Sequence, residues 1–195
     1  MPFPKIKTSQ RIYLSTNMNN FRNFINKSLK THPIVTNSLI YGTLCTGAEF
    51  SQQIISKKVL AKHTQPLDYG IIGRYTIYGT SIGGPLISLW YRFLDKKFQG
   101  TTTKIIVQKL LVDQFTFTAA LLVVFYVSMS VMERKADIFE ECRNKFGQTF
   151  KSSCMFWIPA QTINFMLIPP MYRVTYIGLC SFAWINILCC FKRSQ

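Results

Sequence analysis

The chain has 195 residues, of which 48% are hydrophobic and 16% charged, and its 23 Lys and Arg residues outnumber its 8 Asp and Glu residues. This length favours a single domain. The charges are clustered, and long stretches between the clusters carry none. A soluble helical domain needs polar residues every few positions to keep one face of each helix in water. The distribution excludes an ordinary soluble helical protein and predicts an integral membrane protein.

The first 30 residues are basic, rich in Ser, Thr and Asn, and free of acids. They lack the central apolar run of a secretory signal peptide. This composition is typical of a mitochondrial targeting segment, and it fits a basic tail at a membrane surface equally well. We treat residues 1–30 as an N-terminal segment, residues 31–192 as a single transmembrane helical domain, and residues 193–195 as a short polar tail.

Five apolar windows follow in chain order. The clearest is residues 115–132, FTFTAALLVVFYVSMSVM, which carries no charge. A helix that crosses about 30 Å of hydrocarbon needs about 20 mostly apolar residues. The other windows contain more Gly, Ser, Thr, Asn and Gln, which suits helices that face one another rather than lipid. These windows are residues 31–48, 69–91, 152–172 and 174–191.

The windows predict an all-α protein, a polytopic transmembrane helical bundle of four to five spans with short basic loops. Transmembrane β-barrels instead alternate polar and apolar residues along each strand. The window at residues 174–191 leaves two alternatives. It is either a fifth crossing or the return of a helix that bends at Pro169-Pro170, and the C-terminus changes sides with that choice.

The second window, YGIIGRYTIYGTSIGGPLISLW, carries a stripe of small residues. Gly79 and Gly83 form a GxxxG pair with Gly84 beside it, and such stripes let two helix backbones approach closely. Pro85 lacks a backbone N–H and should kink the helix about one turn earlier. We expect Trp90-Tyr91 to close the span as an aromatic anchor at the membrane interface.

The fourth window places polar side chains on one helix face. Trp157, Gln161 and Asn164 are spaced four and then three residues apart, so they share that face. Amides inside a membrane must bond to another helix, to backbone loosened at Pro159, or to water. They act either as contacts between helices or as the polar lining of a pore.

Charged residues in the windows can be placed by depth. The helical rise of about 1.5 Å per residue puts Glu49 and Arg74 near one face of the membrane. Asp113 and Arg173 fall near the other face. Since unpaired charges in hydrocarbon are costly, we predict a Glu49–Arg74 pair and an Asp113–Arg173 pair. The alternative for Arg74 is a side chain that extends to the nearby surface.

Three motifs occur in order and carry a family resemblance. They are Gly84-Pro85-x-x-x-x-Trp90-Tyr91-x-x-Leu94-Asp95, Lys109-x-x-x-Asp113-Gln114, and Trp157-x-Pro159-x-Gln161-x-x-Asn164-Phe165-x-x-x-Pro169-x-x-x-Arg173. The chain resembles the Mpv-seventeen / peroxisomal membrane protein twenty-two family over residues 24–192. The resemblance implies a small helical protein of an organelle membrane, and some members are described as weakly selective channels for small solutes. The run from Pro169 to Tyr176 is most similar to the Mpv-seventeen-like protein two branch, which is linked to mitochondrial ribosome assembly.

We therefore expect an integral protein of the mitochondrial inner membrane, with the peroxisomal membrane as the alternative. It would form or regulate a weakly selective channel for small solutes and contribute to mitochondrial homeostasis. The alternative function is a membrane-bound assembly factor or scaffold for the mitochondrial ribosome and translation. The pore or polar-network candidates are Glu49, Arg74, Asp113, Gln114, Gln161, Asn164 and Arg173. The packing and kink candidates are Gly79, Gly83, Gly84, Pro85, Trp157 and Pro159.

No enzyme is expected, because the sequence contains no Gly-x-Ser-x-Gly motif and no phosphate-binding loop. His32 and His63 lie outside the expected spans, because the apolar stretch of the first window begins after Pro33, and neither has a matching nucleophile nearby. The six cysteines show no CxxC pair, so we predict no metal and no cofactor. The net charge of +15 favours anionic membrane lipids as partners. Other expected partners are further copies of the chain and the mitochondrial ribosome or another protein, and no direct DNA binding is predicted.

Overall fold

The computed structural model describes residues 8–60, 67–100 and 102–191, and within these residues the chain is helical with short connections and no strand. This confirms the predicted all-α class. The N-terminal residues 1–7 and the predicted polar tail at 193–195 lie outside the described residues. The elements are α1 (Thr8–Thr31), α2 (Pro33–Leu60), α3 (Tyr69–Ile77), η1 (Tyr78–Gly83), α4 (Gly84–Lys97), α5 (Thr103–Val112), η2 (Asp113–Thr118), α6 (Ala119–Met132), α7 (Glu140–Leu167), η3 (Pro170–Tyr172) and α8 (Arg173–Phe191).

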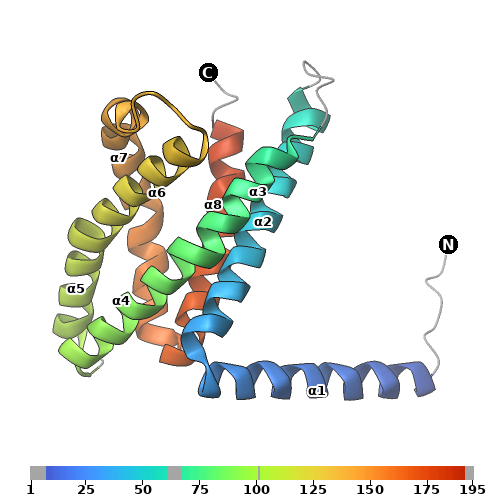
Figure 1. Ribbon diagram of the computed structural model, residues 1–195. Coiled ribbons are helices and arrows are strands. Elements are labelled where there is room, and N and C mark those ends of the chain that lie inside the picture. The colour runs from blue at the N-terminus through green and yellow to red at the C-terminus, as the bar shows by residue number, and fades with distance from the viewer. Residues whose placement is uncertain (1–7, 61–66, 101, 192–195) are drawn as a thin grey trace.

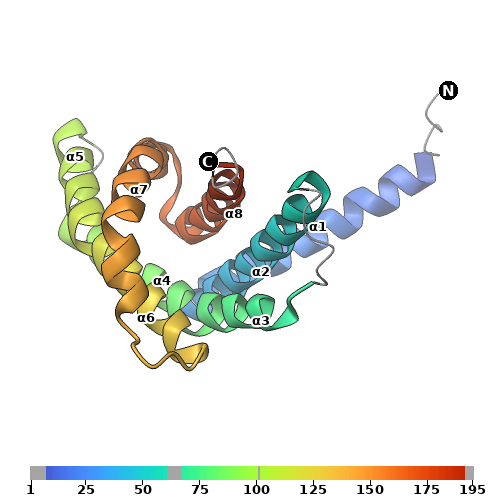
Figure 2. The same cartoon turned by 90° about the horizontal axis from the view of Figure 1, so that it is seen from above.

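These elements form long helical rods. The segments α3, η1 and α4 follow one another without a break, as do α5, η2 and α6. These two rods run alongside α2, α7 and α8, whereas α1 lies across one end of the bundle (Figure 1). Both α8 and the α3–α4 rod pack against α2, and α7 packs against α6. Viewed along the bundle, α5, α6 and α7 lie on one side and α2 and α3 on the other (Figure 2).

The last apolar window forms a separate helix. The proline pair Pro169-Pro170 separates α7 from α8, because proline cannot donate the backbone hydrogen bond that would continue a helix. From this turn, α8 runs back along the bundle and ends at the end opposite α1 (Figure 1). The chain thus turns at Pro169-Pro170, and α8 returns along the bundle as a separate helix.

The helices extend beyond the apolar windows. The helix α5 begins at Thr103 and α7 begins at Glu140, each twelve residues before its predicted window. The helix α2 continues to Leu60. Charged residues bounded the windows, but a helix propagates through them once its apolar turns are packed. The N-terminal segment also forms a helix, α1, whereas the sequence indicated a targeting segment or a basic tail without assigning it a helix.

One described helical segment, Thr103–Met132, is long and apolar enough to cross a membrane by length and composition, with a mean hydropathy of 2.0. Only 17% of its most apolar window is buried, whereas the core helix of a soluble protein would be mostly covered. Large side chains such as Phe115, 61% exposed, and Val131, 54% exposed, lie on its outer surface. An apolar face of this kind suits contact with lipid. The other rods are more polar and fall below the same criterion.

Two rods contain a π-helical turn, namely η1 and η2. Such a turn accommodates one extra residue within an α-helix and occurs frequently at functional sites. In η1 the N–H of Gly84 reaches the carbonyl oxygen of Gly79. The predicted distortion before Pro85 therefore takes the form of a π-helical turn.

The glycines of this rod lie against α2. A Cβ atom added to Gly79 would stand 2.9 Å from the Cα of Gly42, and one added to Gly84 would stand 2.6 Å from the Cα of Ser38. Gly83, which lies between these two glycines in the sequence, is also buried. The backbones thus approach so closely that no side chain fits at Gly79 or Gly84.

The apolar core lies where α2, α4, α7 and α8 meet. Ile87 and Leu94 of α4 are fully buried there, together with Phe165 of α7. Trp157 is partly buried against this core. Pro159, the proline inside α7, is exposed. The packed end of α7 holds the amides described next.

Candidate functional site

A buried carboxylate is the centre of the candidate site. Asp113 is fully buried and lies ten residues after Thr103, about 15 Å into the rod. Its Oδ1 accepts a hydrogen bond of 2.7 Å from Trp90 Nε1, and its Oδ2 accepts one of 2.6 Å from Gln161 Nε2. Donors on both oxygens compensate for the loss of water around this side chain.

Gln161 links this carboxylate to a second helix and to a second amide. Its Nε2 also donates to the Tyr91 hydroxyl at 2.8 Å, and its Oε1 accepts from Asn164 Nδ2 at 2.9 Å. Gln161, Asn164 and Tyr91 are all buried. We call Trp90, Tyr91, Asp113, Gln161 and Asn164 the polar network. It joins α4, η2 and α7.

The site also holds acceptors without a partner among the described residues. The side-chain oxygens of Gln114, Asn164 and Ser153 are buried and unpaired. Gln114 uses its Nε2 to donate to the sulfur of Cys154 at 3.2 Å. An unpaired buried acceptor costs about 1–3 kcal/mol. These atoms can therefore bind water or a polar solute that enters between the helices.

Trp90 and Tyr91 differ from the prediction. They were expected to form an interfacial anchor, but Tyr91 is 4% exposed and Trp90 stacks on Phe117 with ring centroids 4.7 Å apart. Because α4 continues to Lys97, Trp90 lies about 10 Å before the end of the helix. Both rings therefore belong to the interior.

The predicted Asp113–Arg173 pair is wrong. Lys109 Nζ lies 2.9 Å from Asp95 Oδ1, and the Arg173 guanidinium donates to the same oxygen. Arg173 begins α8 at the end of the bundle, whereas Asp113 lies deeper because α5 starts twelve residues before the apolar window. We call Asp95, Lys109 and Arg173 the Asp95 cluster.

The predicted direct pair between Glu49 and Arg74 is also wrong. Arg74 Nε lies 3.6 Å from Glu133 Oε1, and Glu49 accepts a hydrogen bond of 3.0 Å from Gln53. Glu49 and Arg74 remain close enough to attract each other. Glu133 follows the last residue of α6 and lies outside the apolar window, so depth within the windows could not select it.

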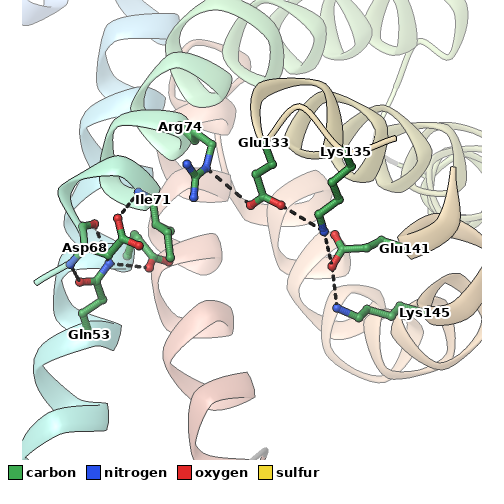
Figure 3. Close-up of polar contacts among 9 residues, drawn as sticks. Gln53, Asp68, Ile71, Arg74, Glu133, Lys135, Glu141 and Lys145 are labelled. Atoms are coloured by element: carbon green, nitrogen blue, oxygen red, sulfur yellow. Dashed lines mark hydrogen bonds and ion pairs between the residues drawn. The ribbon is translucent and has the colours of Figure 1, made fainter. Parts of the chain in front are cut away.

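Arg74 is the first member of a chain of ion pairs (Figure 3). Lys135 Nζ lies 3.1 Å from oxygens of both Glu133 and Glu141, and Lys145 Nζ lies 2.9 Å from Glu141. The hydrogen bond to Glu133 raises the pKa of Lys135, and the hydrogen bond from Lys145 lowers the pKa of Glu141. The chain connects α3, the α6–α7 turn and α7 at the end opposite α1.

A separate groove of about 480 Å³ lies between α2 and α3. Its lining is mostly apolar, with threonines at positions 43, 46, 76 and 80. Their hydroxyls already donate to carbonyl oxygens one turn earlier on their own helices. The groove includes no member of the polar network. The chemistry therefore points to the polar network rather than to this groove.

Comparison with known proteins identifies the family. Residues 130–189 match the model of the Mpv17 / PMP22 family. The chain is 34% identical over 160 residues to an Mpv17-like protein of Xenopus laevis, and the aligned region covers 82% of this chain and 77% of that protein. The chain belongs to the Mpv17 / PMP22 family. It is also 34% identical over 155 residues to protein sym1 of Aspergillus oryzae (79% of this chain, 85% of that protein) and 31% identical over 159 residues to PXMP2/4 family protein 2 of Dictyostelium discoideum (80% and 82%). No solved structure matches the chain.

Membership in the Mpv17 / PMP22 family confirms the resemblance carried by the three motifs. It also supports an organelle membrane, mitochondrial or peroxisomal, as the location of the chain. The site residues that sequence reasoning missed, namely Trp90, Tyr91, Asp95 and Lys109, all lie within those motifs. Their positions in the motifs were thus the signal that could have identified these residues, because neither hydropathy nor depth marks Lys109 as buried.

Proposed function

We propose that this member of the Mpv17 / PMP22 family spans the mitochondrial inner membrane with its five helical rods and forms or regulates a weakly selective pathway for small solutes. The polar network is the observation that carries the proposal. Its carboxylate and amides lie inside the bundle, about 5–15 Å from the end that carries α1, judged by the helical rise. Such groups are costly inside a membrane and are characteristic of solute and ion pathways.

Two features support insertion into a membrane. The helices α2 and α7 have 28 residues each, and at about 1.5 Å per residue each extends about 42 Å, longer than the roughly 30 Å of hydrocarbon. Large apolar side chains on several rods point outward, such as Leu39, Phe115, Met155 and Leu179, which are 56–77% exposed. Lipid would cover this surface.

In the conformation described, the network side chains bond to one another. A solute can pass only when Gln161 and Asn164 separate and offer their donors and acceptors to it. The unpaired oxygens of Gln114 and Asn164 lower the cost of such a state, because they gain partners when water or solute enters. Selectivity would be weak, since amides bind neutral and charged polar solutes alike.

The test is solute efflux and conductance of the purified full-length protein in lipid vesicles. We expect flux in the wild type and an altered rate in Asn164→Leu, which removes both polar atoms of one network amide. Thr162→Val is the matched control on the same helix, because the Thr162 hydroxyl donates to its own helix at Ile158 and takes no part in the network. Absence of flux in the wild type, or equal flux in Asn164→Leu, would contradict a pore through this network.

The second candidate function is a membrane-bound scaffold or assembly factor for the mitochondrial ribosome. It rests on the exposed basic residues at the α1 end of the bundle, namely Lys30, Arg92, Lys96, Lys97 and Lys104. Salt-sensitive co-sedimentation with mitochondrial ribosomal particles tests it. Binding that survives Asn164→Leu and is lost when Lys96 and Lys97 become Gln would favour the scaffold over the pore. Both proposals assign the chain a non-catalytic role.

A further inference from the structure

The Asp95 cluster carries an imbalance of charge. Lys109 Nζ and the Arg173 guanidinium share a single oxygen, Asp95 Oδ1. The two cationic side chains are only 6% and 7% exposed, and the carboxylate is 25% exposed. Two buried cations and one carboxylate leave one positive charge in excess, and a buried charge without a counter-charge is unfavourable.

Neutral groups offset only part of this excess. Arg173 Nε donates to the carbonyl oxygen of Ile168 at 3.2 Å. Lys109 Nζ and Arg173 Cζ lie 5.9 Å and 5.5 Å from the centroid of the Phe165 ring. A carbonyl and an aromatic face stabilise cations, but neither supplies the missing negative charge.

The surroundings do not supply an acid either. Six of the eight acids lie in the other half of the bundle, namely Glu49, Asp68, Glu133, Asp137, Glu140 and Glu141. Asp113 is held by the polar network, which leaves Asp95 as the single acid at the α1 end. The neighbouring exposed side chains Lys96, Lys97 and Lys104 add to the positive field. An anion that approaches this end is therefore attracted toward the cluster.

The position of the cluster matches the depth of lipid phosphates. Asp95 lies two residues before the end of α4, and Arg173 is the first residue of α8. The helix α1 lies across this same end of the bundle (Figure 1), and its Asn26 accepts a hydrogen bond of 2.8 Å from the Tyr172 hydroxyl, next to Arg173. In a membrane-inserted protein this end lies at the headgroup level. The partly exposed Asp95 marks the side from which a ligand can reach the two cations.

We propose that Lys109 and Arg173 form a binding site for a phosphate group at the α1 end of the bundle, with Asp95 as the carboxylate that holds the two cations together. A phosphate oxygen pairs well with a guanidinium and an ammonium that converge on one point. The group would come either from an anionic lipid headgroup or from free phosphate. Only the headgroup depth rests on the proposed membrane insertion, and the site does not require solute flux.

The test is the thermal midpoint Tm of the full-length protein in a neutral detergent, with phosphatidylglycerol, phosphatidylcholine or inorganic phosphate added. We expect a saturable rise of Tm with phosphatidylglycerol in the wild type and in Lys104→Gln, an exposed matched control on the same helix. We expect that rise to be lost in Lys109→Gln. Inorganic phosphate that reproduces the rise identifies the phosphate group alone as the ligand, and a rise confined to phosphatidylglycerol identifies the lipid headgroup.

Asp95→Asn separates this proposal from a purely structural ion pair and serves as the deciding variant where Lys109→Gln does not fold. Loss of the carboxylate leaves both cations free for phosphate, so the Tm rise on addition of ligand should exceed that of the wild type. An equal or smaller rise would overturn the proposal. So would an equal rise in the wild type and Lys109→Gln, or no rise with either phosphatidylglycerol or phosphate.

Discussion

Trp90 and Asp113 join the two long interrupted rods of the bundle, through a hydrogen bond of 2.7 Å from the indole N–H to the carboxyl oxygen. Trp90 belongs to the α3–α4 rod and Asp113 to the α5–α6 rod. The same carboxylate receives Gln161 of α7 on its other oxygen. One buried acid therefore fixes three rods relative to one another.

We predict that Trp90→Phe destabilises the protein by about 1–3 kcal/mol, because the ring packing is kept while a buried carboxyl oxygen loses its donor. Unfolding by denaturant in detergent measures the effect. Trp184→Phe is the control, since a phenyl ring can retain the contact of Trp184 with the Phe156 ring. Equal losses for the two variants would show that the Trp90–Asp113 bond contributes no more than ring size.

We predict that Gly84→Ala destabilises the packing of α4 on α2 by about 1–3 kcal/mol, the usual cost of an added methyl group in a close-packed contact. The new Cβ would stand 2.6 Å from a backbone atom, Cα of Ser38, which cannot move aside alone. Gly73→Ala is the control in the same rod, because no heavy atom lies within 4 Å of its added Cβ. Gly73→Ala should be neutral or stabilise the helix by up to about 1 kcal/mol. Thermal unfolding of both variants decides between these outcomes.

We predict that acid opens the connection between α6 and α7. The pKa of Glu141 is lowered from its ordinary 4.5, first by the hydrogen bond from Lys145. The stability that the ionised Glu141 gives to the turn is therefore complete above pH 4.5 and is lost as pH falls through the lowered pKa. The pKa of Lys135 is raised from 10.5. The stability that the charged Lys135 gives to the turn therefore persists through neutral pH and is lost only as pH rises through the raised pKa. The ion pairs are therefore intact between these two limits.

Hydrogen-exchange protection of the Glu133 and Lys135 amides measures this opening, since both donate to the last turns of α6. Protection factors, corrected for chemical exchange, should fall in the wild type as pH drops through the lowered pKa of Glu141. In Glu141→Gln they should already be reduced at neutral pH and change less with acid. The same acid dependence in both proteins would show that Glu141 does not hold the turn.

We predict that α1 and the α6–α7 turn lie on opposite sides of the membrane, because α2, the α3–α4 rod and the α5–α6 rod run between them. A membrane-impermeant maleimide should label Asn19→Cys from one side and Cys142 from the other in sealed vesicles. Both side chains are at least partly exposed, whereas Cys45 is 4% exposed and is the internal control that stays unlabelled. Labelling of both positions from the same side would contradict three crossings.

Much of the helical content follows from hydropathy, since most residues of every apolar window are helical. The helix starts do not follow from hydropathy, because the residues from Thr103 and from Glu140 up to the next window include charged side chains. These starts decide the partners of the charged residues. With α5 beginning at Thr103, Lys109 is buried although it precedes the apolar window, and Asp113 lies too deep to meet Arg173.

The polar face of α7 was predictable from spacing, and Gln161 and Asn164 do lie together. The acceptor of Gln161 was not predictable from spacing, because the pairing of Asp113 with Gln161 depends on how α7 is rotated against η2. The Arg74–Glu133 contact depends in the same way on a turn between helices. Long-range contacts of this kind follow from packing and not from the local sequence.

The two π-helical turns make the register of each interrupted rod depend on chain length. One residue more or less turns the following helix by about 100° relative to the preceding one. Deletion of Ser81 within η1 would convert that turn to a regular α-helix and rotate α3 against α4. Arg74 would then move away from Glu133, while Trp90 kept its bond to Asp113. In the α3–α4 rod, the angle between the face of α3 that carries Arg74 and the face of α4 that carries Trp90 is thus set by a single inserted residue.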